Sequence, residues 1–140
     1  MVSKPEKTKE QMANVRVYLK DLENFGKIGI GEFKVDRKCQ LAVLHALQLA
    51  IEGCLSIGAG IISADELGMP KDYADIFDIL KKNDIIKPEL SGKLMDMARF
   101  RNKMVHMYWQ IDLDKVYDIL NNRLVDMHDY LKAISGYLGS

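Results

Sequence analysis

The strongest constraint on the fold is one long apolar run at residues 41–62, LAVLHALQLAIEGCLSIGAGII. A helix of this length could cross a bilayer. However, His45, Gln48 and Glu52 lie along its middle, and a charged side chain at the bilayer centre is costly. The other interpretation is a helix that neighbouring helices bury on most sides. We expect the buried helix, and we expect no membrane partner.

The rest of the chain shows helical spacing of apolar residues and no strand alternation. The segment GKIGIGE at 26–32 predicts a turn, and it lacks the Lys-Ser/Thr pair that a phosphate loop requires. We predict one all-α domain over residues 1–140, an antiparallel bundle of about five helices with a flexible tail at 1–9. The helices are marked, in chain order, by Met12 to Phe25, Asp36 to Ile62, Pro70 with Asp72, Pro88 with Glu89, and Asp112 or Asp114 with Gly136 and Gly139.

Composition limits the possible partners. Hydrophobic residues make up 48% of the 140 residues, and the formal net charge is zero. A neutral chain has no overall attraction to nucleic acid, so any contact with a polyanion must come from a local patch. Cys39 and Cys54 fall on the central helix, where a rise of about 1.5 Å per residue places them roughly 22 Å apart. That separation excludes a disulfide, and reduced thiols predict a cytoplasmic protein.

The fourth helix carries an arginine within its apolar stripe, in the segment MARFRNKMVHMYW at 97–109. A guanidinium at such a position needs acceptors, because an unpaired buried charge is strongly destabilising. Arg101 therefore either has a buried acidic partner or lines a cleft that receives an anion. Glu52 is the candidate partner, and Gln48 lies one turn away on the same face of the central helix. The stripe consists of Leu90, Leu94, Met97, Arg101, Met104, Val105 and Tyr108.

His106 and Tyr108 follow the arginine closely. At about 100° per residue, Tyr108 is nearly eclipsed with Arg101, whereas His106 is about 140° away. A straight isolated helix would not direct Arg101 and His106 at one small group. The helix could bend or end near His106, or the long side chains could converge over its edge. A second chain could also place its own side chain near the same group. Taken alone, His106 could be a structural histidine and Tyr108 the end of an apolar stripe.

The segment RNKMVHMYW spells Arg-x-x-x-x-His-x-Tyr, with Asn102 directly after Arg101. It resembles the motif of HEPN-domain toxins of the HepT type, the ribonuclease toxins of HepT/MntA type II or VII toxin–antitoxin systems. The apolar run at 41–62 resembles the long second helix of that family, including its glutamine and glutamate four residues apart. The segment PKDYADIFDILKKNDIIKPEL resembles the third helix and the turn after it. The resemblance covers roughly residues 12–135.

This resemblance implies a homodimeric helical bundle that works as a toxin, a metal-independent endoribonuclease with RNA as its substrate and no cofactor. Arg101 and His106 match the catalytic pair, and Asn102 matches the polar residue that follows the arginine. Tyr108 matches the tyrosine to which the partner, a cognate minimal nucleotidyltransferase antitoxin, transfers AMP. Glu52 and Gln48 are expected to be supporting polar residues.

The chemistry of metal-free RNA cleavage suits these side chains. The ribose 2′-hydroxyl attacks the phosphorus, so a base, an acid and a positive charge on the phosphorane are needed. His106 can transfer protons near neutral pH, and Arg101 can clamp phosphate oxygens. One histidine per chain falls short by one group, which a dimer with two motifs in one cleft would supply. The three histidines, His45, His106 and His128, lie on different predicted helices, so no metal site is expected.

Two other function classes stay open from the residues alone. One is a non-catalytic nucleotide- or nucleotidyltransferase-binding subunit, and the other is a plain helical dimerisation domain. The dimer is expected to form through the central and fourth helices. The reason for this expectation is the central helix, which is apolar on most faces and carries small residues at Gly53, Gly58 and Gly60.

Overall fold

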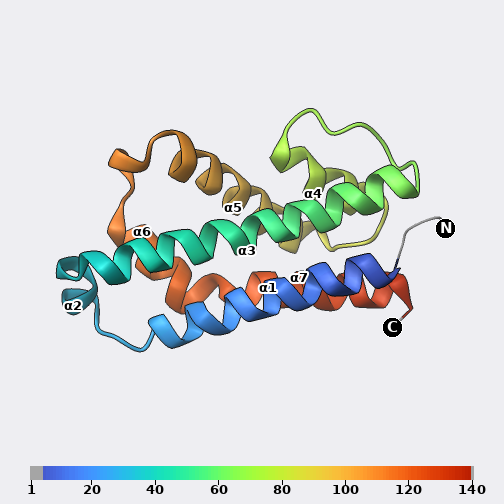
Figure 1. Ribbon diagram of the computed structural model, residues 1–140. Coiled ribbons are helices and arrows are strands. Elements are labelled where there is room, and N and C mark those ends of the chain that lie inside the picture. Colours follow the sequence, from blue (N-terminus) through green and yellow to red (C-terminus); the bar gives the residue numbers. More distant parts are fainter. Residues whose placement is uncertain (1–4, 140) are drawn as a thin grey trace.

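The computed structural model describes residues 5–139, and for Pro5 the backbone alone. Over these residues the chain forms an all-α bundle without strands, as the sequence predicted (Figure 1). In chain order the α-helices are α1 (Pro5–Phe25), α2 (Ile30–Val35), α3 (Arg37–Ala64), α4 (Tyr73–Lys82), α5 (Pro88–His106), α6 (Leu113–Asp118) and α7 (Leu124–Leu138). A 3-10 turn, η1 (Tyr108–Gln110), follows α5, and a π-helical segment, η2 (Ile119–Arg123), joins α6 to α7.

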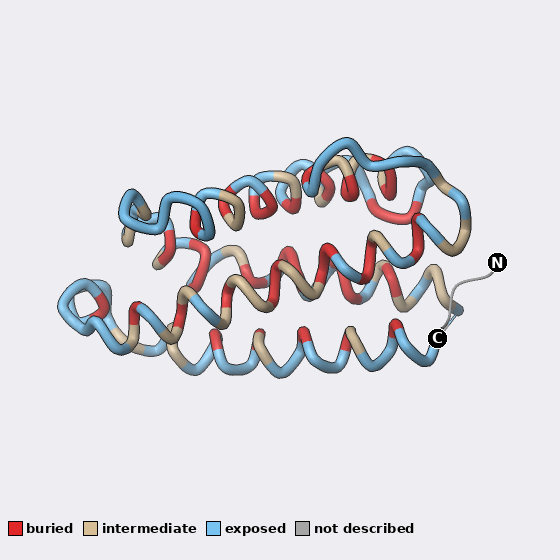
Figure 2. Tube along the Cα trace, turned by 45° about the horizontal axis from the view of Figure 1, so that its top comes forward, coloured by how far each residue is buried: buried red, intermediate tan, exposed pale blue. Residues whose placement is uncertain are grey.

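Helix α3 lies at the centre of the bundle (Figure 1). It packs against α1, α4, α5 and α7, and its inward face contributes eleven buried residues to the core. Figure 2 shows buried positions recurring along the inner sides of the helices, with exposed positions on the outer sides. The buried-helix interpretation of residues 41–62 is thus the one the fold adopts. In the described part of the chain, α3 is also the one helix that is long and apolar enough to span a membrane.

Helix boundaries follow the signals in the sequence. Asp36 caps α3 by accepting from the Cys39 backbone N–H at 3.0 Å, and Asp72 caps α4 by accepting from the Asp75 N–H at 2.8 Å. Of the two predicted caps for α6, Asp112 is the one used, since its side chain accepts from the Asp114 N–H. Pro88 begins α5 at a position where its missing N–H costs nothing.

Three details of the predicted fold were wrong. Residues 5–9, which were expected to belong to a flexible tail, form the start of α1, and residues 1–4 lie outside the described residues. The turn expected at 26–32 is shorter, because α2 begins at Ile30 and buries Phe33 in the core. The fifth helix is interrupted by η2, within which the Asn121 side chain donates to the Tyr117 carbonyl at 3.1 Å.

Two of the three glycines on α3 serve packing inside the bundle. A Cβ at Gly53 would lie 2.5 Å from a methyl of Val15 on α1. A Cβ at Gly58 would lie 2.7 Å from a methyl of Ile76 and 2.9 Å from the Tyr130 hydroxyl. Gly60 meets nothing within 4 Å. Gly53 and Gly58 therefore explain how closely α3 approaches its neighbours, and they give no support to a dimer surface.

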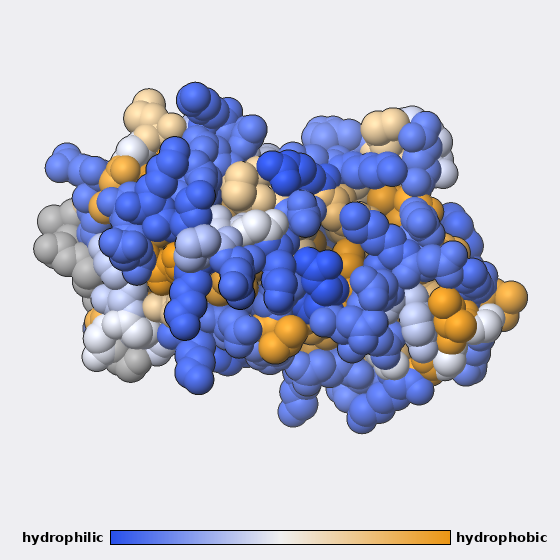
Figure 3. Space-filling view, turned by 180° about the vertical axis from the view of Figure 1, so that it is seen from behind, coloured by the Kyte–Doolittle hydropathy of each residue, from blue (hydrophilic) through white to orange (hydrophobic). Residues whose placement is uncertain are grey.

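The outer surface is mainly polar where Figure 3 shows it, from behind the view of Figure 1. Apolar atoms on that side form separate small patches, some of them at the end of the molecule that carries α2. Helix α2 itself exposes Ile30 and Val35.

Candidate active site

The arginine in the apolar stripe of α5 faces α3 and pairs with an acidic side chain there. Its Nε and Nη2 donate to the same Glu52 oxygen, Oε2, at 3.0 and 2.7 Å. The Arg101 side chain is 14% exposed and that of Glu52 is 32% exposed. The Arg101–Glu52 ion pair expected from the sequence is thus present, at the rim of the core where α5 crosses α3.

Two further polar groups complete this cluster. Gln48 donates its Nε2 to Glu52 Oε2 at 3.0 Å, and Arg101 Nη1 donates to Asn102 Oδ1 at 3.2 Å. A guanidinium has five N–H donors in a planar fork. Glu52 uses two of them and Asn102 uses one, so one N–H on each terminal nitrogen remains for another acceptor. A pair of such donors is the arrangement that binds phosphate oxygens bidentately.

Tyr73 is a member of this cluster that the sequence interpretation missed. It is the first residue of α4, in which Ile76, Phe77 and Leu80 are buried. Tyr73 instead is 49% exposed, and the Arg101 guanidinium carbon lies 5.0 Å from its ring centroid. This cation–π contact holds the guanidinium from one side. The available signal was its position directly after the Asp72 cap. A residue there lies at the very start of the helix.

His106 is the last residue of α5. The helix stops there because Met107 leaves the helical region at φ −139° and ψ 45°. The His106 side chain is exposed, and within residues 5–139 it has no hydrogen-bond or ion-pair partner. A structural role for this histidine is therefore unsupported, and its ring nitrogens remain free for proton transfer.

Tyr108 and Trp109 occupy the short η1 turn beyond the helix. They are 68% and 66% exposed, and their rings meet edge to face with centroids 5.4 Å apart. The expectation that Tyr108 is eclipsed with Arg101 on one helix was wrong, because the helix ends two residues before it. Its hydroxyl is accessible for modification all the same.

The geometry thus divides the predicted site residues into two groups. Gln48, Glu52, Arg101 and Asn102 form one hydrogen-bonded cluster between α3 and α5. His106 ends α5 and Tyr108 lies on the turn after it, both exposed and without hydrogen bonds to that cluster. The first group has side-chain hydrogen bonds, and the second group has none among the described residues.

The sequence profile of a family described as Ribonuclease HepT-like matches residues 15–134. The chain belongs to the HepT-like ribonuclease family. It is 33% identical over 103 residues to the mRNA nuclease HepT of Shewanella oneidensis, which covers 74% of this chain and 77% of that protein. It is 28% identical over 121 residues to the tRNA nuclease HepT of Aphanizomenon flos-aquae, which covers 86% of this chain and 82% of that protein.

Solved structures of the family have the same fold. A tri-AMPylated HEPN toxin of Shewanella oneidensis, in complex with an MNT antitoxin, superposes with a TM-score of 0.86 at 29% identity, over 92% of this chain and 96% of that one. A toxin–antitoxin crystal structure with AMP-PNP superposes with a TM-score of 0.87 at 28% identity, over 92% of this chain and 97% of that one.

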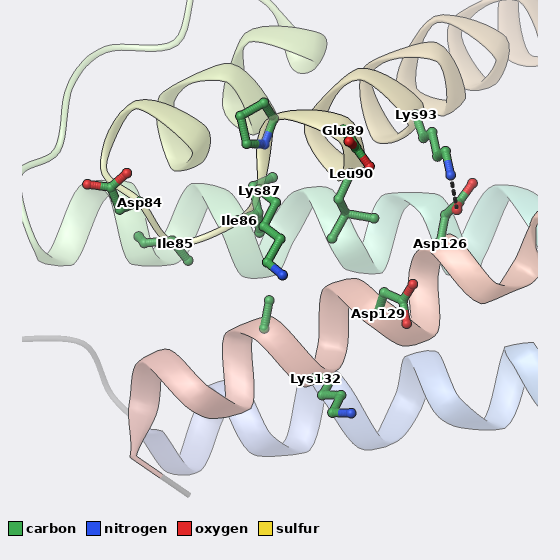
Figure 4. A pocket seen from close by; sticks show the side chains of 12 residues that line it. Asp84, Ile85, Ile86, Lys87, Glu89, Leu90, Lys93, Asp126, Asp129 and Lys132 are labelled. Atoms are coloured by element: carbon green, nitrogen blue, oxygen red, sulfur yellow. Dashed lines mark ion pairs between the residues drawn. The ribbon is translucent and has the colours of Figure 1, made fainter.

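A cavity lies away from the motif, at the opposite end of α5. It measures about 620 Å³ and is bordered by the segment before α5 and by α7. Figure 4 shows lysine and carboxylate side chains mixed along its rim, with the Lys93–Asp126 pair marked. Asp126 is buried there and also pairs with Arg123 at 3.0 Å. Because acidic and basic side chains are mixed along its lining, this cavity offers no concentrated charge of one sign for a substrate.

The cysteines show no sign of a nucleophile. Burial raises the pKa of the Cys54 thiol to about 12. Partial burial, followed by the nearby Asp36 and Glu32 carboxylates, raises the pKa of Cys39 as well. Both effects favour the unreactive thiol over the thiolate. In the part of the chain that is described, no group of three or more His, Cys, Asp or Glu side chains could hold a metal ion.

Proposed function

We propose that this chain is the toxin of a toxin–antitoxin pair, a metal-independent endoribonuclease of the cytoplasm in which Arg101 and His106 form the catalytic pair. One observation carries the proposal. Arg101 is held in place by Glu52 and Asn102 yet keeps two N–H donors, and a histidine without a partner ends the same helix. The family's named relatives are nucleases that act on mRNA or tRNA.

In the proposed reaction the 2′-oxygen of the RNA attacks the adjacent phosphorus, and the bond to the 5′-oxygen of the next nucleotide breaks. Arg101 stabilises the charge that develops on the phosphorane oxygens through its two remaining donors. His106 moves one proton, either from the 2′-hydroxyl or to the leaving 5′-oxygen. Glu52, Gln48 and Asn102 act as positioning residues that fix the plane of the guanidinium.

A homodimer would supply the second proton-transfer group. With one motif per chain, the two copies of His106 could serve as base and acid if a two-fold axis brings them into one cleft. The outward side of α3 supports such an interface, since Leu41 is 53% exposed there and Leu44 is partly buried. Sizing with light scattering at micromolar concentration should give twice the monomer mass of 15.9 kDa, and a monomer would contradict the dimer.

Neutralisation is proposed to act on Tyr108. The partner is a minimal nucleotidyltransferase that transfers AMP from ATP to the exposed hydroxyl. The phenol oxygen bonds to the α-phosphorus, pyrophosphate leaves and the phenol proton is released, which adds a phosphate close to the catalytic helix end. That phosphate would compete with RNA for the cationic groups there. A tri-AMPylated toxin among the structural relatives supports this proposal.

Expression in bacteria tests the proposal as a whole. Wild-type chain should arrest growth, and His106→Ala should not. Co-expression with the cognate nucleotidyltransferase should restore growth and add AMP to the peptide that contains Tyr108, as read by mass spectrometry. A wild-type chain that binds the nucleotidyltransferase without arresting growth would instead indicate a non-catalytic binding subunit. An unmodified Tyr108 in a neutralised complex would mean that the partner acts by steric binding.

A further inference from the structure

Trp109 is a large aromatic side chain that lies outside the hydrophobic core. The sequence contains a single tryptophan, and its side chain is 66% exposed on the η1 turn. The Tyr108 ring approaches it edge to face, at an interplanar angle of 81°. In such an arrangement one ring presents its edge to the other's face, so flat aromatic surface remains open to solvent.

The turn that carries Trp109 is well ordered by its own hydrogen bonds. The Gln110 N–H donates to the Met107 carbonyl at 2.9 Å, and the Ile111 N–H donates to the Tyr108 carbonyl at 3.4 Å. The ring is thus presented from a fixed backbone. Such a platform loses little conformational entropy when a flat partner stacks on it.

A groove with three basic and two acidic side chains lies near this turn. It encloses about 240 Å³ between α5 and the start of α6, the two helices that η1 connects. Its lining residues are Asp96, Arg99, Phe100, Lys103, Asp112 and Lys115. Arg99 pairs with Asp96 at 3.3 Å. In the described part of the chain, Lys103 has no carboxylate partner, and Lys115 contacts only the Phe100 ring, 5.6 Å from its centroid.

Trp109 and this groove are close to the proposed catalytic histidine. Trp109 follows His106 by three positions, so their Cα atoms are no more than about 11 Å apart. Lys103 lies one turn before His106 on the same side of α5. An aromatic face and two unpaired lysines therefore border the point at which the RNA backbone would be cut.

We propose that Trp109 is a stacking platform for an unpaired nucleobase of the RNA substrate, next to the scissile phosphate, with Lys103 and Lys115 holding the adjacent backbone phosphates. This inference rests on the proposed ribonuclease function and adds a substrate class, single-stranded RNA. Stacking on exposed aromatic rings beside a positively charged groove is how proteins hold single strands. A second protein chain is a poorer occupant, because unpaired lysines are depleted at the centres of protein interfaces.

The single tryptophan makes the subsite directly observable. Intrinsic fluorescence of the His106→Ala chain should fall in a saturable manner when a single-stranded oligoribonucleotide is added, because a stacked base quenches the indole. A duplex of the same sequence should quench far less at equal concentration. Absence of quenching while RNA binding is detected by another signal, such as polarisation of a labelled oligonucleotide, would overturn the proposal.

Kinetics give the second readout. Trp109→Ala should raise KM for single-stranded RNA about 10-fold and leave kcat within about 2-fold, since stacking contributes to binding of the strand. Trp109→Phe should recover most of the loss. Val125→Ala removes a different exposed apolar side chain, on α7, and should change neither constant. Equal KM values for Trp109→Ala and wild type would contradict the subsite while leaving the ribonuclease proposal intact.

Salt dependence tests the lysines. The double variant Lys103→Gln/Lys115→Gln should lower the slope of log affinity against log salt by about 1.4, as expected when two phosphate contacts to a single strand are lost. Lys81→Gln/Lys82→Gln is the matched control, because both lysines pair with Asp78 and the change in net charge is the same. Equal slopes for the two double variants would contradict the role of the groove.

Other outcomes would show that Trp109 binds a partner other than RNA. A tryptophan emission that shifts with protein concentration in the absence of RNA would mean that a second copy covers Trp109. A change in tryptophan fluorescence with the nucleotidyltransferase but not with RNA would mean that the antitoxin covers Trp109. Failure of the wild type to cleave any RNA would contradict the proposed function, whereas the fluorescence titration would still decide whether Trp109 binds a single strand.

Discussion

The two ends of α5 differ in how fully their side chains are used by the fold. Near its start, Ser91 is buried and its hydroxyl donates to the Phe77 carbonyl at 3.1 Å, while Leu94 is buried in the core. At its end, His106 is exposed and Tyr108 and Trp109 stand on the turn beyond it. Arg101 lies between the two ends. It pairs with Glu52 and keeps two guanidinium N–H donors for another acceptor. The exposed side chains at the end of α5 and on the turn after it are the ones that are accessible for chemistry.

The largest expected effect is the loss of activity when the unpartnered histidine is removed. His106→Ala should slow RNA cleavage by at least about 100-fold, the lower part of the range for general acid–base catalysis. The melting temperature should stay the same, because the exposed imidazole makes no hydrogen bond or ion pair within the described residues.

His128→Ala is the control for this change. His128 is also exposed but pairs with Glu23 at 2.6 Å on the other side of the bundle. Its removal should leave the cleavage rate unchanged. A comparable loss of rate in both variants, or a melting point that falls only for His106→Ala, would remove the distinction between the two ends of α5.

The packed part of the molecule should respond in the opposite way, in stability rather than in activity. Gly58→Ala should lower the free energy of unfolding by roughly 1–3 kcal/mol, since the new methyl overpacks the crossing of α3 with α4 and α7. Gly60→Ala, on the same helix with open space around it, should leave stability unchanged or raise it by up to about 1 kcal/mol. Denaturant titration measures both, and similar values for the two would show that the close contact at Gly58 does not limit packing.

Glu52→Gln tests the boundary between the two regions. The amide keeps the size of the side chain and removes the charge that orients Arg101. Because the Glu52 side chain is 32% exposed, the loss of stability should be modest, about 1 kcal/mol. The cleavage rate should fall about 10-fold as the guanidinium loses its fixed plane. A large drop in stability with full activity would mean that the pair serves the fold alone.

The smallest effect concerns the two thiols. Cys39 is partly exposed, whereas Cys54 is buried with a pKa of about 12. At pH 8, a thiol reagent should label Cys39 in the folded chain and leave Cys54 unlabelled until denaturant is added. Labelling of Cys54 at the rate of Cys39 would show that the core around α3 opens readily. Neither modification is expected to change the cleavage rate.

The sequence was sufficient to predict the elements with strong periodicity and the main anomaly of the site. The steps of three and four in α5 identified Arg101 as out of place, and the line of polar residues on α3 identified Glu52 as its partner. The sequence left open whether the helix bends or ends near His106, so it could not place the residues beyond that point. The backbone angles of Met107 end α5, so Tyr108 does not continue the apolar stripe of that helix as predicted. Helix α2 is too short to show periodicity, and Tyr73 meets Arg101 only because α4 and α5 pack together.

The most direct test of the proposed chemistry is the structure of the RNA ends produced by the purified chain in excess chelator. If the 2′-oxygen is the nucleophile and Arg101 and His106 do the work, cleavage should continue in chelator. The products should then carry a 5′-hydroxyl and a 2′,3′-cyclic phosphate or its hydrolysis product, and a 2′-deoxy nucleotide at the scissile position should block the cut. Loss of cleavage in chelator, or products with a 5′-phosphate and a 3′-hydroxyl, would contradict a metal-independent mechanism.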